Sequence, residues 1–154
     1  MGVYPGALSR EPRRGRASAA PRSAAADSVH PRTRARLDET GLAKRLEAAS
    51  NVHVTTPVGY LTMLALLVNA RLVLTDSGGL QKEAYVLRKP CVTVSAQTAW
   101  VETVASGWNR LVNADAGAIR EAMTAFDGGT HHEEVYGRGD ACAQIRDRLV
   151  SALR

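Results

Sequence analysis

The sequence predicts an α/β fold, in which a Rossmann-like parallel sheet is flanked by helices. Two observations support this prediction. After residue 30, short runs rich in Val, Leu and Cys alternate with longer segments of helical periodicity. One of these runs, residues 72–74, leads into a glycine-rich turn that opens a helical segment. Strands separated by helices form parallel sheets, and such sheets bind ligands at the carboxyl ends of their strands.

The expected elements follow in order along the chain. A polar helix is expected over residues 34–49, because Leu37, Leu42 and Leu46 make one apolar stripe at helical spacing. Short apolar runs bounded by turn residues predict strands. The strands are expected at residues 51–55, 72–75, 91–94 and 111–112, and further helices at residues 60–69, 80–87, 100–105, 116–126 and 140–153.

The start of the chain differs in composition from the rest. Residues 1–36 hold eight of the 20 Lys and Arg residues and two of the 15 Asp and Glu residues, so the net charge of +5 arises there. A segment rich in Arg, Ala, Pro and Ser has too little apolar surface to offset the entropy of ordering. We therefore expect residues 1–29 to be disordered, with only a poor strand at residues 23–29, and residues 30–154 to form one partial domain.

A basic segment of this kind has alternative interpretations. It can be an arm that binds nucleic acid or an acidic membrane surface, or a transit peptide. The segment lacks aromatic residues interleaved with its arginines, and its prolines fit an amphipathic helix badly. We therefore favour an extension without function and expect no nucleic-acid partner.

Residues 75–84, with the sequence TDSGGLQKEA, make a candidate anion site. A helix that begins after a Ser-Gly-Gly turn presents unpaired backbone N–H groups and the positive end of its dipole. Ser77 is a good N-cap, and Gly78 and Gly79 let a diphosphate approach the backbone. Glu83 lies four residues after Gly79, where its carboxylate can accept ribose hydroxyls. The turn therefore predicts a nucleoside diphosphate site.

Two other interpretations of this turn compete with that one. Connections of this kind often serve only to cap a helix. The DSGG segment also resembles the serine region of trypsin-like proteases, with Ser77 as nucleophile and His30 as base. Thr75 stands where those proteases have glycine, and the chain has no G-x-S-x-G elbow, so hydrolase chemistry is disfavoured.

Four blocks follow one another in a specific order along the chain. They read HPRTRARL from His30, PVGYLTML from Pro57, ARLVLTDSGGLQKEAYVLRKPCVTV from Ala70 and TAWVETVASGWNRLV from Thr98. In order and spacing these blocks resemble the C-terminal half of the non-hydrolysing UDP-N-acetylglucosamine 2-epimerases. The resemblance implies the C-terminal domain of a two-domain, glycosyltransferase-B-like fold. It also implies an isomerase that converts UDP-N-acetylglucosamine to UDP-N-acetylmannosamine by elimination and re-addition of UDP.

The resemblance assigns roles to particular residues. His30 would contact the departing diphosphate, Glu83 the ribose, and Tyr60 and Met63 the uracil pocket. The substrate-binding residues that it implies are Ser77, Gly78, Gly79, Glu83, Tyr60 and Met63. On local pattern alone, His30 is equally a loop histidine before proline, and Tyr60 and Met63 are equally core residues at helical spacing.

The chain departs from the family pattern at three positions. Ser95 stands where members usually carry an arginine that holds the diphosphate, Ala99 where they carry glutamate, and Arg88 where a glycine begins the G-K-P turn. A hydroxyl does not replace the bidentate charge of arginine. We therefore expect weakened nucleotide binding, with Lys89 as a candidate substitute.

The length of the chain limits the function further. A chain of 154 residues fits one domain, whereas the family architecture has two. We expect the truncated chain to contribute only the UDP-binding half, without the N-terminal catalytic domain. Three hypotheses follow: an epimerase that needs its missing half, a non-catalytic UDP or UDP-sugar binding module, or an inactive structural remnant. The expected partners are UDP-N-acetylglucosamine or UDP, with a homodimer or a separately encoded N-terminal domain.

No metal or cofactor is expected. Cys91 and Cys142 lack metal-ligand spacing, Cys91 is expected to be a small buried residue, and the adjacent residues 131–134 (HHEE) are expected to form a solvated loop. The most apolar segment, residues 61–68, is too short to span a bilayer. We therefore expect a cytoplasmic location with reduced thiols and no membrane partner.

Overall fold

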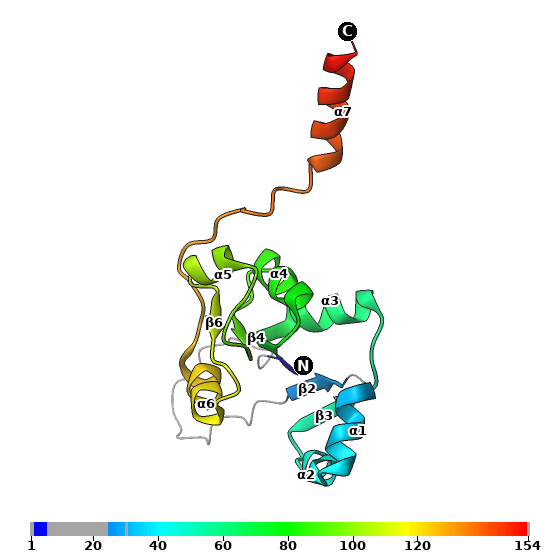
Figure 1. The fold of residues 1–154 in the computed structure, drawn as a ribbon, viewed down its shortest axis with the longest axis vertical. Helices are drawn as coiled ribbons and strands as arrows, with labels where there is room; N and C mark the ends of the chain where they lie inside the picture. The colour runs from blue at the N-terminus through cyan, green and yellow to red at the C-terminus, as the bar shows by residue number, and fades with distance from the viewer. Residues whose placement is uncertain (1, 6–24, 30, 154) are drawn as a thin grey trace, which may run out of the picture.

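The computed structural model describes residues 2–5, 25–29 and 31–153 (Figure 1). The strands are β1 (Gly2–Pro5), β2 (Ala25–Ser28), β3 (Val52–Thr55), β4 (Ala70–Thr75), β5 (Cys91–Thr93) and β6 (Asn109–Leu111). The helices are α1 (Pro31–Glu39), α2 (Leu42–Glu47), α3 (Tyr60–Asn69), α4 (Gly78–Val86), α5 (Val101–Ala105), α6 (Ala116–Ala125) and α7 (Ala141–Ala152). Helix α3 has the bounds that its apolar periodicity predicts, and each strand predicted after residue 50 is present within two residues.

The strands form one six-stranded sheet in the order β3-β2-β1-β4-β5-β6. β2 and β3 pair in parallel, and so do β4, β5 and β6. β1 lies between β2 and β4 and is antiparallel to both, so the other five strands all point the same way. The predicted α/β fold with a parallel sheet is confirmed for these five strands, and β1 is an unexpected antiparallel addition. Their carboxyl ends meet at one side of the sheet, which we call the carboxyl edge.

The two faces of the sheet bury separate apolar clusters. Successive side chains of a strand point to opposite faces, so Leu72 and Val73 of β4 face different helices. The cluster that includes residues of α3 and α4 consists of Met63, Leu67, Ala70, Val73, Leu80, Ala84 and Cys91. The cluster that includes a residue of α6 consists of Leu72, Val92, Val112 and Ala122. Helices therefore cover both faces of the β4–β5 region, and the turn that follows β4 rests on a packed core.

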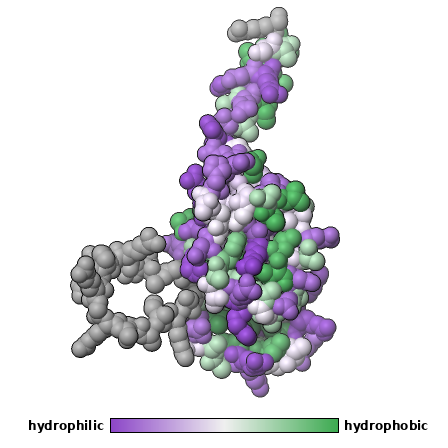
Figure 2. Space-filling view, turned by 90° about the vertical axis from the view of Figure 1, so that its left-hand side faces the viewer, coloured by the Kyte–Doolittle hydropathy of each residue, from purple (hydrophilic) through white to green (hydrophobic). Residues whose placement is uncertain are grey.

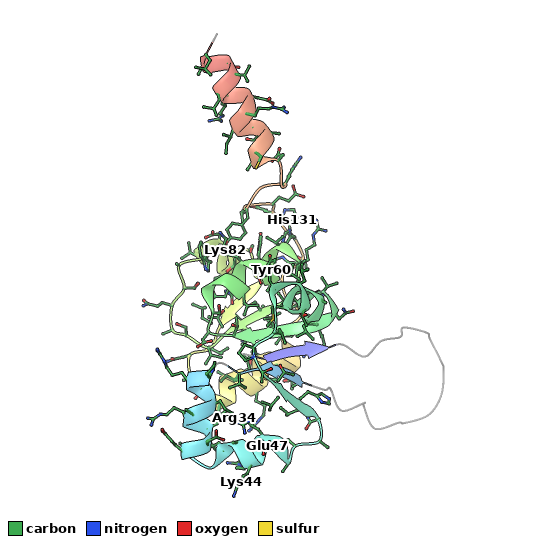
Figure 3. All side chains as sticks on the ribbon, turned by 90° about the vertical axis from the view of Figure 1, so that its right-hand side faces the viewer. Arg34, Lys44, Glu47, Tyr60, Lys82 and His131 are labelled. Atoms are coloured by element: carbon green, nitrogen blue, oxygen red, sulfur yellow. The ribbon has the colours of Figure 1, made fainter. Side chains whose placement is uncertain are left out.

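The first helical segment is two short helices, where the sequence predicted one. Gly41 separates α1 from α2 with a φ of +70°, a left-handed conformation that glycine adopts readily. An ion pair between Arg34 Nη2 and Glu47 Oε1, 2.7 Å apart, connects the two helices (Figure 3). Of the predicted apolar stripe, Leu37 and Leu46 are half-buried and Leu42 is exposed.

The start of the chain contributes strands to the sheet, contrary to the prediction that residues 1–29 are disordered. β1 pairs along β4, with Gly2 opposite Leu74, and β2 pairs in parallel with β3. β1 and β2 therefore belong to the same sheet as the strands that follow residue 50. Composition did not reveal these strands because strand formation depends on partners elsewhere in the chain. Residues 6–24 lie outside the described part.

Helix α7 projects away from the body of the domain (Figures 1 and 2). None of its residues is buried, and the apolar side chains of Ile145, Leu149 and Val150 are all exposed. The sequence predicted two closing helices, and this holds for α6, whose Ala122 is buried, but not for α7. Within the described ranges, no helix is both long and apolar enough to cross a membrane.

Candidate nucleotide site

The turn between β4 and α4 lies at the carboxyl edge of the sheet. β4 ends at Thr75, Ser77 occupies the N-cap position, and α4 begins at Gly78. The Ser77 hydroxyl makes no capping hydrogen bond, contrary to the expected capping role of this side chain. The Ser77 backbone N–H instead donates to Thr75 Oγ1 over 3.0 Å. Its N–H is therefore occupied, while its hydroxyl is left for a ligand.

Three backbone N–H groups of the first turn have no acceptor in the described part of the chain. They belong to Gly78, Gly79 and Leu80, whereas the Gln81 N–H donates to Ser77 O over 3.2 Å. Such N–H groups, together with the helix dipole, favour a negative charge. The backbone donors available to an anion are therefore the N–H groups of Gly78, Gly79 and Leu80, and the Ser77 N–H is not among them.

The two glycines of the turn have different surroundings. A Cβ atom at Gly78 would lie 3.0 Å from Trp100 Nε1. A Cβ atom at Gly79 would meet only Ser77 Oγ, at 3.9 Å, and Gly79 is exposed. A side chain at Gly78 would therefore press against Trp100, whereas a side chain at Gly79 would enter the open space above the turn.

Lys82 and Trp100 flank the Gly78 side of the turn. Lys82 Nζ lies 4.3 Å from the ring centroid of Trp100 and 4.6 Å from that of Tyr136. The two rings meet edge to face with centroids 6.3 Å apart. Figure 3 labels Lys82 on α4, above the sheet. The spacing of four between Gly78 and Lys82 is the sequence signal that places both on one side of α4, whereas the contacts of Lys82 with Trp100 and Tyr136 arise from folding.

Glu102 lies on α5, next to this aromatic cluster. A backbone N–H lowers the pKa of the Glu102 carboxyl, and the Tyr136 hydroxyl and the Lys82 charge lower it further. Burial raises the pKa of Tyr136 above its usual range, and the nearby Glu102 carboxylate adds to this increase. The buried Tyr136 hydroxyl nevertheless makes no hydrogen bond of good geometry to any described residue. Glu102 therefore carries a negative charge close to Lys82 without forming an ion pair with it.

Behind the turn, polar side chains form a buried hydrogen-bond network centred on Asn109. Asn109 Oδ1 accepts from Thr93 Oγ1 over 2.7 Å. Asn109 Nδ2 donates to Gln81 Oε1 and to Thr103 Oγ1, both over 3.1 Å. Thr98 Oγ1 also donates to Gln81 Oε1, over 2.6 Å. Because Gln81 belongs to the first turn of α4, the network fixes that turn relative to β5, α5 and β6.

Glu83 is half-buried on α4 and forms no ion pair with any described residue. The two nearest basic residues in sequence, Lys82 and Arg88, do not pair with it. Lys82 lies instead over the aromatic rings, and Arg88 follows the end of α4. The Glu83 carboxylate is therefore free to accept hydrogen bonds, and its contact with a ribose stays a prediction.

The three other predicted site residues have different positions. Tyr60 begins α3, which follows β3 at the carboxyl edge, and its side chain is 63% exposed. Met63 is a buried member of the core cluster that contains Leu80, so its observed role is packing beneath the turn. Contacts of Tyr60 and Met63 with a base stay predictions. His30 lies outside the described residues.

The three departures from the family pattern lie at both ends of the sheet. Ser95 follows β5 at the carboxyl edge, where its hydroxyl donates to Gln97 O over 2.8 Å. Ala99 is exposed in the same connection. Arg88 and Lys89 precede β5, at the opposite end of the sheet. Lys89 is therefore wrongly placed to substitute for an arginine at the carboxyl edge.

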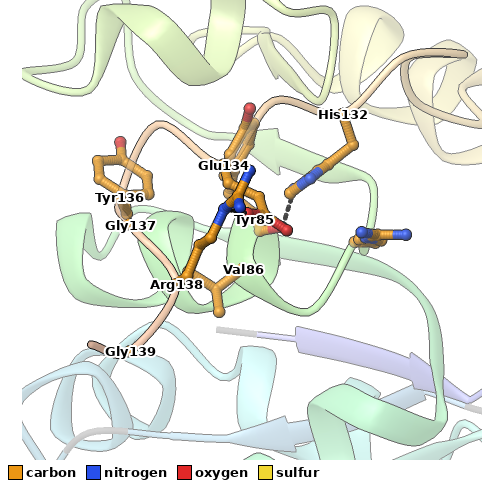
Figure 4. Close-up of a pocket in the computed structure, with 9 residues that line it drawn as sticks. Tyr85, Val86, His132, Glu134, Tyr136, Gly137, Arg138 and Gly139 are labelled. Atoms are coloured by element: carbon orange, nitrogen blue, oxygen red, sulfur yellow. Dashed lines mark hydrogen bonds and ion pairs between the residues drawn. The ribbon is translucent and has the colours of Figure 1, made fainter.

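A separate cavity of about 340 Å³ lies at the far end of α4 (Figure 4). His132 stacks on Tyr85 with ring centroids 4.4 Å apart, and its Nε2 lies 2.8 Å from Tyr85 O. The Tyr85 hydroxyl donates to Glu133 O over 2.7 Å. Residues 131–134 form a loop, as predicted, and His131, Glu133 and Glu134 are exposed, but the half-buried His132 packs against α4. The described residues contain no group of three or more side chains arranged to hold a metal ion.

The two cysteines are expected to differ in reactivity. Burial raises the pKa of the Cys91 thiol to about 12, whereas Cys142 is exposed. Because the thiolate is the reactive form, Cys91 stays protonated and unreactive at neutral pH. Titration of the native protein with a disulfide reagent should modify Cys142 quickly, and Cys91 only after denaturation. Rapid reaction of both thiols in the folded protein would contradict the observed burial of Cys91.

The fold and this turn define a class of protein: a Rossmann-like α/β domain with a glycine turn at the carboxyl edge whose first N–H groups are unpaired among the described residues. Residues 17–150 match the UDP-N-acetylglucosamine 2-epimerase family, and the chain belongs to that family. The family and the fold class predicted from the sequence are therefore confirmed.

Individual relatives agree with this assignment. The chain is 43% identical over 122 residues to a UDP-N-acetylglucosamine 2-epimerase homolog from Methanococcus maripaludis, covering 79% of this chain and 34% of that protein. It is 46% identical over 124 residues to the UDP-2,3-diacetamido-2,3-dideoxy-D-glucuronate 2-epimerase of Pseudomonas aeruginosa, covering 79% and 33%. The chain spans about one third of the length of these relatives.

A solved structure shares the fold. The UDP-GlcNAc 2-epimerase of Methanocaldococcus jannaschii, in complex with UDP-GlcNAc and UDP, superposes with a TM-score of 0.73 at 36% sequence identity. The match covers 82% of this chain and 35% of that one.

Proposed function

We propose that this chain is the UDP-binding part of a UDP-N-acetylglucosamine 2-epimerase, and that it holds the UDP group at the turn between β4 and α4. The observation that carries the proposal is the set of three unpaired N–H groups at Gly78, Gly79 and Leu80, with the unpaired Glu83 carboxylate one turn further along α4. The similarity to an epimerase structure in complex with UDP supports it.

The chemistry of the family suits such a site. Elimination breaks the bond between C1 of the sugar and the diphosphate oxygen and removes the proton from C2, and UDP then adds back after C2 has inverted. Charge builds on the diphosphate as it departs, and fixed N–H donors stabilise it. In this proposal the turn binds the leaving group, and Glu83 holds the ribose hydroxyls. Groups outside this chain take and return the C2 proton.

The sugar of the substrate and the protein partners are proposed from the family rather than from the geometry of the turn. The Pseudomonas aeruginosa relative is named for a diacetamido glucuronate, so UDP is the group common to the named substrates. We propose UDP-N-acetylglucosamine as the substrate because the matching family carries that name. We propose that a separately encoded N-terminal domain supplies the catalytic groups, with a homodimer as the alternative assembly, and that the protein is cytoplasmic.

Calorimetric titration of the full chain with UDP tests the binding proposal. We expect saturable binding, weakened roughly tenfold by Glu83→Ala, because each lost hydrogen bond to a polar ligand is worth about 1–1.5 kcal/mol. Glu121→Ala serves as the matched control, since Glu121 is an exposed helix carboxylate paired with Arg110 far from the turn. Absence of binding by folded protein at millimolar UDP would reject the proposal and leave a structural remnant.

Turnover is a separate measurement. Formation of UDP-N-acetylmannosamine by the chain alone would show that it supplies its own proton-transfer groups, for example as a homodimer. Turnover that appears only after adding the N-terminal domain of a relative would identify this chain as the UDP-binding half. UDP binding without turnover in either mixture would favour a non-catalytic UDP-binding module.

A further inference from the structure

We propose that Lys82 and Trp100 form a charged wall of the UDP site, in which the Trp100 indole N–H donates to the diphosphate and Lys82 supplies the neighbouring positive charge. This inference rests on the proposed function, because it assigns two further binding residues to the same site. Neither residue was among the substrate-binding residues predicted from the sequence.

The position of Trp100 is the first argument. Its Nε1 lies 3.0 Å from the point where a Cβ atom would stand on Gly78, so the indole N–H borders the turn that carries the free backbone donors. Trp100 Nε1 has no acceptor among the described residues. The other tryptophan, Trp108, donates its Nε1–H to His131 O over 2.7 Å. A half-buried indole N–H usually finds an acceptor, and at Trp100 the diphosphate is the group that fits.

The position of Lys82 is the second argument. Its ammonium group lies against the rings of Trp100 and Tyr136, which attract a cation without neutralising it. No carboxylate of a described residue lies within ion-pair distance of it. Glu102 is near enough to sense its charge, but a backbone N–H and the Tyr136 hydroxyl also stabilise that carboxylate. Lys82 therefore keeps donors for an incoming anion.

The other cations of this part of the sheet are unsuitable. Among the described residues 70–113, Arg88 and Lys89 precede β5 at the end of the sheet opposite the turn. Arg71 lies at the start of β4 and pairs with Asp127, and Arg110 pairs with Glu121. Lys82 is thus the cation of this region that lies beside the turn. A diphosphate bound by backbone N–H groups alone would lack a positive side chain, and Lys82 supplies one.

Substitutions separate the two contributions. Trp100→Phe keeps an aromatic ring beside Lys82 and removes only the indole N–H. Lys82→Met keeps the apolar stem and removes the charge, and Lys82→Arg restores a cation that also stacks on aromatic rings. Lys44→Met is the control, since Lys44 is an exposed lysine on α2, away from the turn (Figure 3). Thermal unfolding of each variant verifies that it is folded.

The test is calorimetric titration of the full chain and each variant with UDP, at low and high salt. Trp100→Phe and Lys82→Met should each weaken UDP binding by roughly tenfold, the scale of one hydrogen bond to a charged group. Lys82→Arg should bind nearly as well as the parent chain, and Lys44→Met should bind equally well. Raising the salt concentration should weaken UDP binding less in the Lys82→Met chain than in the parent chain, because the variant lacks one positive charge that salt screens.

The outcomes distinguish this inference from the proposed function. If the parent chain binds UDP and the Trp100→Phe and Lys82→Met variants bind it equally well, Trp100 and Lys82 do not contact UDP. The proposed UDP site at the turn is then unaffected. If Lys82→Arg binds as poorly as Lys82→Met, the charge of Lys82 is not what UDP recognises, and the Lys82 part of the inference is overturned. If the folded parent chain does not bind UDP, the proposed function fails, and this inference fails with it.

Discussion

Replacing Asn109 with alanine should lower the free energy of unfolding by about 3 kcal/mol, since three buried hydrogen bonds are lost at about 1 kcal/mol each. Asn109 is 3% exposed, so its hydrogen bonds are shielded from solvent. The Thr93 hydroxyl, which is fully buried, would lose its acceptor. Loss of a partner in a network of this kind costs more than loss of an exposed bond.

Urea denaturation measures this effect, with Asn69→Ala as the matched control. The Asn69 amide donates to Ala65 O on the exposed surface of α3, so its removal should change stability by less than about 0.5 kcal/mol. Because Gln81 connects the network to the first turn of α4, Asn109→Ala should also weaken UDP binding in protein that is still folded. Equal stability losses in the two variants would mean that the Asn109 network does not support the fold.

Alanine at Gly78 and at Gly79 should have opposite effects on stability. At Gly79 the backbone φ is not positive and the space is open, so alanine fits without strain. Alanine there should stabilise the fold by about 0.4–1 kcal/mol, because it lowers the conformational entropy of the unfolded chain. At Gly78 the added Cβ would press on Trp100 Nε1, and alanine should destabilise by about 1–3 kcal/mol. Thermal unfolding of the two variants in the absence of nucleotide measures this difference.

UDP affinity should fall in both variants. At Gly79 the methyl group would occupy the space over the free N–H donors and weaken binding by roughly tenfold or more, although the protein is more stable. At Gly78 the displaced indole would also lose its place beside the turn. A Gly79→Ala chain that binds UDP as tightly as the parent would place the diphosphate elsewhere on the carboxyl edge.

Local pattern was enough to predict the elements that form from neighbouring residues. Helix α3 was predicted with correct bounds, since it is one continuous, largely apolar segment. Strands β3 to β6 are short apolar runs with turn residues at both ends, and they were predicted within two residues. The helix expected over residues 34–49 divides at Gly41, because that glycine takes a left-handed conformation. An isolated glycine in a helical pattern is compatible with either outcome.

Features that depend on distant partners were not predictable in the same way. The segment that contains β2 has poor strand composition, and its pairing with β3 becomes evident only in the folded sheet. In the site, the glycine turn and Ser77 at its N-cap position were predicted, but the Ser77 hydroxyl makes no capping hydrogen bond. The bond between Asn109 and Gln81 joins residues 28 positions apart, and the contact of Trp100 with Gly78 joins residues 22 positions apart.

The central position of β1 has a consequence for how the chain folds. β2 and β4 do not pair with each other, so β1 alone joins the two-stranded part of the sheet to the three-stranded part. Gly2 pairs with Leu74, about 70 residues away, and contacts of such high sequence separation form slowly because a long loop must close first. The strands β4, β5 and β6, with the helices between them, can form local contacts early. Docking of the N-terminal strand then becomes the late step that unites the sheet into one cooperative unit.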